Sequence, residues 1–141
     1  MIKLYYSLVY SHLTYALLAW GRSGSTNAAE IECAHRRACK LLTDYNQKIL
    51  TFHSIYDYFA LLKGFNTNNL NFHQYLPSHI HNTRHRTNSN LHTPLFNHSK
   101  TQKGYLYQVI PIWNSLPKLL KNCTFKFTFK KQIKSHLLAS H

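Results

Sequence analysis

Acidic side chains are scarce in this sequence of 141 residues, which has 4 Asp and Glu against 17 Lys and Arg and a formal net charge of +13. Polymerase, nuclease and phosphatase chemistry by two metal ions requires clustered carboxylates. Glu30 and Glu32 would face different ways on a helix, while Asp44 and Asp57 are isolated. We interpret each acid as a helix cap or a surface charge, and we expect no catalytic residue and no enzymatic activity in this chain.

Glycine and cysteine are also scarce, with four and three residues. The sequence has no Gly-rich phosphate-binding loop. The cysteines Cys33, Cys39 and Cys123 form no Cys-x-x-Cys pair, and an odd number favours free thiols in a reducing compartment. The N-terminus does not resemble a signal peptide, because no small-residue cleavage site follows an apolar core. We therefore expect an intracellular protein, located in the cytoplasm, the nucleus or both.

Histidine is abundant, with eleven residues, but its spacing does not favour a metal site. Five of these histidines gather in one polar segment: His79, His81, His85, His92 and His98. Zinc sites usually combine ordered spacing with cysteines or a helix, and no such pattern fits here. His35 near Cys33 or Cys39 suggests a thiol nucleophile, but a helix stripe of small residues explains these positions better. We predict no metal and no cofactor.

Apolar residues recur at three- and four-residue spacing, which predicts a mainly α fold, a small bundle of about four helices. The first helix is expected over residues 2–20; polar residues interrupt this stretch, so it is interpreted as a buried helix rather than a membrane span. Its apolar stripe comprises Ile2, Tyr5, Tyr6, Val9, Leu13, Ala16, Leu17 and Trp20. The second begins near Asn27, with Glu30 completing a capping box. Its stripe comprises Ile31, Ala34, Ala38, Leu41 and Leu42.

A third helix is expected to begin at Ser54, with Asp57 at its third position and an inward face of Ile55, Tyr58, Phe59 and Leu62. The last helix is expected over residues 124–139, with Phe125, Phe129, Ile133 and Leu137 facing inward. Between them, residues 91–96 and 105–110 form a candidate short β-hairpin. Residues 112–116, bracketed by prolines, are predicted to form a short helical turn whose Trp113 packs on the body of the protein.

Composition divides the chain into three parts: a helical segment over residues 1–65, a polar His/Asn-rich linker over 66–104, and residues 105–141, which end in a basic helix. Positive charge follows the same division. All four acids lie within the first 57 residues, whereas residues 76–141 hold ten Lys and Arg and no acid. Such a balance points first to nucleic acid and second to an anionic membrane. The second half is therefore the expected polyanion surface.

The candidate contacts to phosphate fall into two groups. On the second helix they are Arg36, Arg37 and Lys40. In the acid-free half they are Arg84, Arg86, Lys100, Lys103, Lys126, Lys130, Lys131 and Lys134. The alternative for each single residue is a solvated surface charge, and the set as a whole favours binding.

Five segments, taken in order, resemble the region downstream of the palm in non-LTR (LINE, jockey-like) retrotransposon reverse transcriptases. They are Leu4–Tyr15 ending in Ala19-Trp20-Gly21, Ile31–Leu42, His81-Asn82-Thr83-Arg84, Gly104–Pro117 with its Trp-Asn-Ser-Leu-Pro block, and Phe129–Leu138. The family's catalytic Ala-Asp-Asp motif, fingers, palm and endonuclease have no counterpart here. The resemblance therefore implies a thumb-like and C-terminal region without its active site.

The resemblance and the charge together predict a non-catalytic C-terminal fragment of an RNA-directed DNA polymerase. It would contact element RNA or the template-primer, RNA or DNA, and the absent upstream reverse transcriptase domains are further expected partners. Two alternatives stay open. One is a truncated retroelement remnant with no independent function. The other, ranked last, is a basic membrane-surface protein, because the last helix is basic and amphipathic; we expect no membrane partner.

Overall fold

The computed structural model describes residues 2–21, 25–42, 49–66, 90–93 and 104–139, and within these ranges the chain is mainly α-helical, as predicted. The N-terminal helical pieces are α1 (Ile2–Leu4), the π-helical η1 (Tyr5–Tyr10), α2 (Ser11–Thr14) and α3 (Leu17–Trp20). The later helices are α4 (Ser25–Leu42), α5 (Phe52–Asn66), α8 (Tyr105–Ser115), α9 (Lys118–Lys121) and α10 (Lys126–Ala139). The linker arginines Arg84 and Arg86 and most of residues 66–104 lie outside the described residues.

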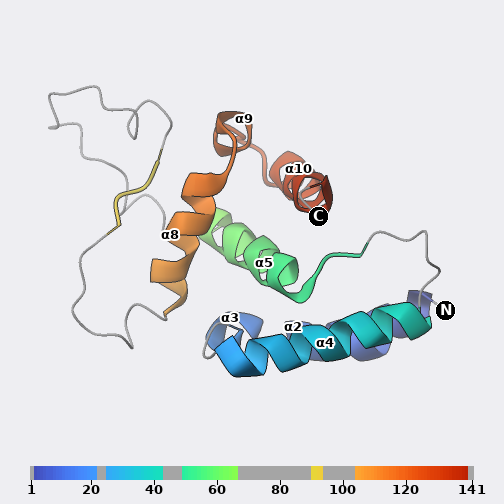
Figure 1. Ribbon diagram of the computed structural model, residues 1–141. Helices are drawn as coiled ribbons and strands as arrows, with labels where there is room; N and C mark the ends of the chain where they lie inside the picture. The colour runs from blue at the N-terminus through green and yellow to red at the C-terminus, as the bar shows by residue number, and fades with distance from the viewer. Residues whose placement is uncertain (1, 22–24, 43–48, 67–89, 94–103, 140–141) are drawn as a thin grey trace, which may run out of the picture.

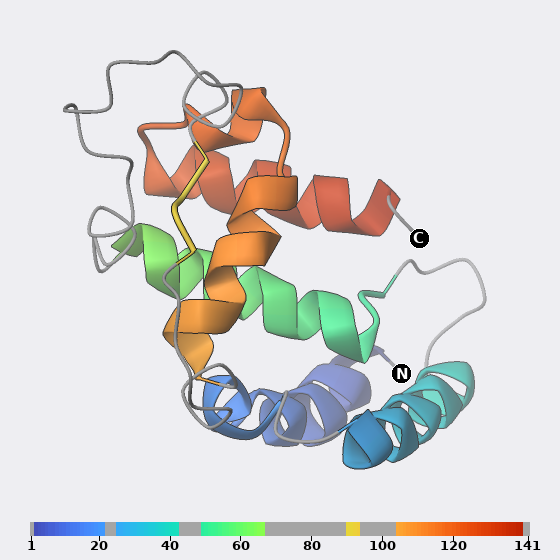
Figure 2. The ribbon, with the colours of Figure 1, turned by 60° about the vertical axis from the view of Figure 1, so that its left-hand side comes forward.

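Helix α5 lies at the centre of the molecule. In both ribbon views α10 and α4 lie on opposite sides of it, and α8 crosses it (Figures 1 and 2). Its buried side chains point in nearly every direction around the helix: Phe52, Ser54, Ile55, Tyr56, Tyr58, Ala60 and Leu61. A helix that is apolar all round belongs in the interior, and this one joins the core residues of segments 1–65 and 105–141 into one cluster.

The predicted start of α5 at Ser54 is wrong by two residues. The helix begins at Phe52, and Thr51 precedes it, with its Oγ1 accepting a hydrogen bond from the Ser54 N–H at 3.3 Å. Thr51 is therefore the N-cap, and Ser54 rather than Asp57 occupies the third helical position. The predicted inward face is confirmed for the buried Ile55 and Tyr58, while the other two members are partly buried against the core.

The predicted single helix over residues 2–20 is wrong, because the chain breaks at Tyr15 and Ala16. Ala16 has φ of 50°, in the left-handed region that costs an L-residue about 1–2 kcal/mol. The break redirects α3 toward α5: Leu17 is buried, and the half-buried Trp20 stacks on Phe52 with ring centroids 5.7 Å apart. Packing of these two side chains offsets the strain at Ala16.

Gly21, at the end of α3, permits this close approach to α5. A Cβ at this position would lie 2.7 Å from both the Leu17 carbonyl oxygen and a ring carbon of Tyr56. These contacts are far shorter than van der Waals distance, so only glycine fits without displacing the helix pair.

Helix α4 departs from its predicted register. It begins at Ser25, so Asn27 lies inside the helix and is not its N-cap. The predicted apolar stripe is wrong at Leu41, which is 79% exposed, and at the exposed Ala34. The face turned to the protein instead buries the polar residues Glu32 and His35.

The candidate hairpin is wrong, because residues 105–110 belong to α8. Short apolar runs do not distinguish a strand from a buried helix, and here the helical period prevails. The buried residues of this helix share one face: Val109, Ile110, Ile112 and Trp113. Trp113 packs on the body of the protein as predicted, with its ring 5.9 Å from that of Phe129. Pro111 lies inside the helix on the exposed side.

Asn114, in the Trp-Asn-Ser-Leu-Pro block, fixes the extended residues 90–93 against α8. Its Oδ1 accepts a hydrogen bond from the Leu91 N–H at 2.7 Å, and its Nδ2 donates to the Leu91 carbonyl at 3.0 Å. The amide thereby pairs with both backbone groups of Leu91, as a neighbouring strand would. Leu91 is buried as a result.

Helix α10 begins two residues later than predicted, so Phe125 lies ahead of it and is 75% exposed. Phe129 and Ile133 are buried as predicted, and Leu137 is partly buried against the core. Phe129 stacks on Phe65 of α5 with ring centroids 4.3 Å apart. These contacts fix the orientation of α10 and leave its lysines exposed.

We predict that Asn114→Ala lowers the free energy of unfolding by roughly 1–3 kcal/mol, because it removes the side-chain partner of both partly buried backbone groups of Leu91. Asn114→Asp should destabilise as well, since a carboxylate oxygen would then face the Leu91 carbonyl. The exposed Asn122→Ala serves as the control and should change stability by less than about 0.5 kcal/mol. Urea denaturation followed by circular dichroism measures all three. Equal stability of Asn114→Ala and the parent protein would contradict the assigned role.

Candidate functional site

Seven of the eleven predicted binding residues lie in the described part of the chain, and all seven are exposed. They are Arg36, Arg37 and Lys40 on α4, and Lys126, Lys130, Lys131 and Lys134 on α10. Arg84, Arg86, Lys100 and Lys103 lie outside the described residues. The two helices are on opposite sides of α5 (Figures 1 and 2), so the structure does not bring the two groups onto one face.

The lysines of α10 form the stronger candidate surface. Lys126, Lys130 and Lys134 recur every four residues, which places successive side chains about 6 Å apart along the helix axis. The helix contains no acidic residue in its whole length. Among the described acids, none forms an ion pair with these lysines. We call this row, together with Lys131, the lysine face of α10.

This charge arrangement works against the helix itself. Lys126 occupies the first turn, where the positive end of the helix dipole disfavours a cation, and no acid stands there to compensate. Like charges at i,i+4 repel each other further. Burial of Phe129 and Ile133 stabilises the helix despite these unfavourable charge interactions. A local conflict of this kind is typical of a functional surface.

The basic group on α4 is partly neutralised. The helix holds Arg36, Arg37 and Lys40 but also Glu30 and Glu32. The Arg36 Nε donates to the Glu32 Oε1 at 3.0 Å, although 69% of the Arg36 side chain is exposed. This group therefore offers less net charge to a polyanion than the lysine face of α10.

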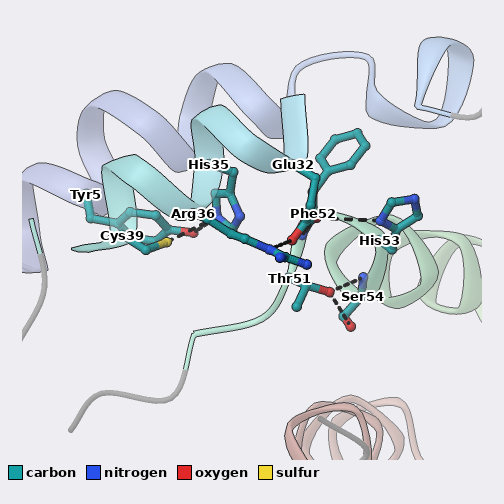
Figure 3. A network of polar contacts seen from close by, with 9 residues as sticks. All are labelled: Tyr5, Glu32, His35, Arg36, Cys39, Thr51, Phe52, His53 and Ser54. Atoms are coloured by element: carbon teal, nitrogen blue, oxygen red, sulfur yellow. Dashed lines mark hydrogen bonds and ion pairs between the residues drawn. The ribbon is translucent and has the colours of Figure 1, made fainter. Parts of the chain in front are cut away.

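Glu32 is the centre of a buried polar network (Figure 3). The sequence alone had led us to interpret this residue as a helix cap or a surface charge. Its Oε2 accepts a hydrogen bond from the Phe52 N–H at 2.9 Å and lies 3.5 Å from the His53 Nδ1. Burial by itself raises the pKa of the Glu32 carboxyl, but the hydrogen bonds from Arg36 and the Phe52 N–H outweigh it and hold the pKa below its usual value. The carboxylate thereby caps α5 from a different helix, for which no local sequence signal exists.

His35 occupies the same buried face, one turn along α4. Its Nε2 lies 2.8 Å from the Tyr5 hydroxyl and 3.5 Å from the Cys39 Sγ, and its Nδ1 is buried without a hydrogen-bond partner among the described residues (Figure 3). Burial lowers the pKa of His35, with Glu32 opposing the shift, and burial raises the pKa of the Cys39 thiol. A neutral imidazole beside a protonated thiol is not an activated nucleophile, so the geometry favours a structural contact.

Described residues line a cavity and an open groove. A cavity of about 50 Å³ is lined by Tyr5, Tyr6, Tyr10, Ile49, Leu50, Ile55, Tyr58 and Lys134. It is too small for a nucleotide base or a typical ligand. An open groove of about 290 Å³ is lined by Thr14, Ala16, Leu17, Leu18, Ala19, Phe59 and Lys63. The Thr14 hydroxyl already donates to Tyr10, and Lys63 lies over the Tyr105 ring, so this groove offers little polar chemistry.

The described residues contain no group of three or more His, Cys, Asp or Glu side chains arranged to hold a metal ion. Of the five clustered histidines, His92 alone is described, and it is exposed. No helix among the described segments has the length and apolarity needed to cross a bilayer. Searches against family models, curated proteins and solved structures find no match to this chain.

We predict that Glu32→Ala lowers the free energy of unfolding by about 2–4 kcal/mol, because it removes the acceptor of the Phe52 N–H at the start of α5 and the buried partner of Arg36. Glu30→Ala on the same helix removes an equal charge from an exposed position and should change stability by less than about 0.5 kcal/mol. Urea denaturation compares the two variants. A similar loss in both would show that general charge, rather than the cap, is responsible.

The burial of His35 makes stability depend on pH. Its pKa is lowered in the folded state, so the unfolded chain binds the proton more readily, and stability falls as pH drops below about 6.5, the unfolded value. Between about pH 7.5 and pH 5.5, we predict that the free energy of unfolding falls less in His35→Gln than in the parent protein, as measured by urea denaturation at both pH values. Exposed His12→Gln is the control and should follow the parent. Identical pH dependence of His35→Gln and the parent would refute the assignment.

Proposed function

We propose that this chain is a non-catalytic nucleic-acid-binding module, the C-terminal region of a LINE-type RNA-directed DNA polymerase, and that it contacts RNA or the template-primer through the lysine face of α10. The observation that carries the proposal is an acid-free row of exposed lysines anchored by Phe129 and Ile133. Lysine contacts to phosphate release condensed counterions and supply most sequence-independent affinity. The lysine face therefore provides attachment without base-specific readout.

The segments that resemble the retrotransposon family serve mainly to build the scaffold. Trp113 and Leu116 are buried, and Asn114 holds Leu91 in place. Gly21 permits the contact between α3 and α5. In this proposal the residues that resemble the family pack the fold, and the lysines contact phosphate. Such a division of roles fits a binding module better than an enzyme.

A membrane-surface role is less well supported for this helix. An interfacial amphipathic helix inserts its apolar face among the acyl chains. In α10 the central apolar residues Phe129 and Ile133 are fully buried against the protein. Insertion of this face would require the helix to leave α5.

We predict that changing Lys126, Lys130 and Lys134 together to Gln flattens the plot of log K against log salt by about 2 units on single-stranded RNA, because each lost phosphate contact removes about 0.7. The matched control changes three exposed cations elsewhere, Lys3, Arg37 and Lys40, to Gln, so both variants lose the same net charge. The control should flatten the slope by clearly less. Fluorescence anisotropy over a salt titration measures the affinity.

Circular dichroism should show that both variants keep their helix content, since every changed side chain is exposed. Equal flattening in the two variants would mean that general charge, not the lysine face of α10, governs binding. Absence of binding by the parent protein at low salt would refute the proposed function and leave a retroelement remnant as the better account.

A further inference from the structure

Two large aromatic side chains stand exposed at the N-terminal end of α10. Phe125 is 75% exposed and Phe127 is 80% exposed, and Lys126 lies between them in the chain. Neither ring is among the residues that build the core or pack against it. The fold does not use these rings, since Phe129 and Ile133 already anchor the helix.

The charges around the two rings select the kind of partner. Lys130 and Lys131 follow within the next turn, and Lys118 is exposed on the neighbouring short helix α9. Helices α9 and α10 contain no acidic residue. Exposed aromatic rings among lysines, on helices that hold no acid, match a ligand that carries flat apolar groups on a polyanionic backbone. Unpaired nucleotides have this chemistry.

We propose that the exposed rings of Phe125 and Phe127 each stack on an unpaired base, together forming what we call a stacking platform, so that this end of α10 binds single-stranded rather than duplex nucleic acid. The inference rests on the proposed function and deepens it. In a duplex the base faces are covered by neighbouring bases, and only the edges are open in the grooves. In a single strand each base offers a free face, and stacking on an aromatic side chain is tolerant of sequence. Lys126, Lys130 and Lys131 would contact the phosphates beside the stacked bases.

The test changes ring character while leaving charge and size nearly constant. In the full chain, Phe125→Leu with Phe127→Leu keeps apolar side chains but removes the stacking faces. Affinity for a single-stranded oligonucleotide should fall by roughly tenfold or more, because each stacked base contributes a factor of this order. Affinity for a duplex of the same length should change by less than about twofold. Phe125→Tyr with Phe127→Tyr should restore single-strand binding.

A second variant controls for the loss of exposed apolar surface in general. Tyr15 and Leu41, 80% and 79% exposed, lie on other elements of the protein. Tyr15→Ala with Leu41→Ala should leave single-strand affinity unchanged. Urea denaturation of every variant establishes that stability is retained, which is expected because none of the altered side chains is buried.

A fluorescent base analogue such as 2-aminopurine in the oligonucleotide reports stacking directly. Its emission should change on binding the parent and the tyrosine variant but not the leucine variant. The salt slope should be the same in all three, because their charges are equal, whereas the lysine variant changes that slope. The proposed function and the stacking platform can therefore fail separately.

Several results would overturn the stacking platform. Unchanged single-strand affinity in the leucine variant would do so while leaving lysine-mediated binding intact. An equal loss on duplex and single strand would show that the rings support the surface without stacking. Tight binding to anionic phosphatidylserine vesicles, lost in the alanine variants of both phenylalanines but kept in the leucine variant, would assign the rings to a membrane. Absence of any nucleic-acid binding would refute both proposals.

Discussion

The hydrogen bond from the Phe52 N–H to the Glu32 carboxylate is the constraint on which the rest of the structure depends. A buried carboxylate is strongly unfavourable unless donors surround it, and here Arg36, the Phe52 N–H and the α5 dipole supply that compensation. Because α5 lies at the centre of the fold, fixing its N-terminus also fixes α4 beside it. The same face of α4 then carries His35 against Tyr5, which ties the π-helical η1 to this arrangement.

The elements that could be predicted from the sequence are those in which apolar residues recur at helical spacing. Helices α5 and α10 follow from the spacing of Ile55 and Tyr58 and of Phe129 and Ile133. The polar interactions could not be predicted, because Glu32 accepts a hydrogen bond from a residue twenty positions later and Asn114 pairs with Leu91, twenty-three positions earlier. These hydrogen bonds form only once the helices have packed together, so no local sequence pattern predicts them.

The remaining errors have the same origin. A uniform helical pattern over residues 2–20 conceals the break at Ala16, which exists because Leu17 and Trp20 reach α5 only when the chain turns. The strand-like run at 105–110 becomes helical because Val109 and Trp113 must share one face toward α5. The exposed lysines of α10 were predictable, since long charged side chains that flank an apolar stripe can reach solvent without a tertiary partner. The exposure of Phe125 was not, because the helix begins only after it.

Helix α10 combines two faces that depend on different physics. Its inner face is held by Phe65 and Trp113 through contacts with Phe129, and this packing does not depend on salt. Its exposed face carries lysines that repel one another, with Lys126 in the first turn near the positive end of the helix dipole, and a bound polyanion would relieve that repulsion. The residues that stabilise the helix, Phe129 and Ile133, are therefore not the lysines to which we assign phosphate contact. If the proposed contact is made, the helix itself is already formed, so binding would not have to supply the free energy of folding it.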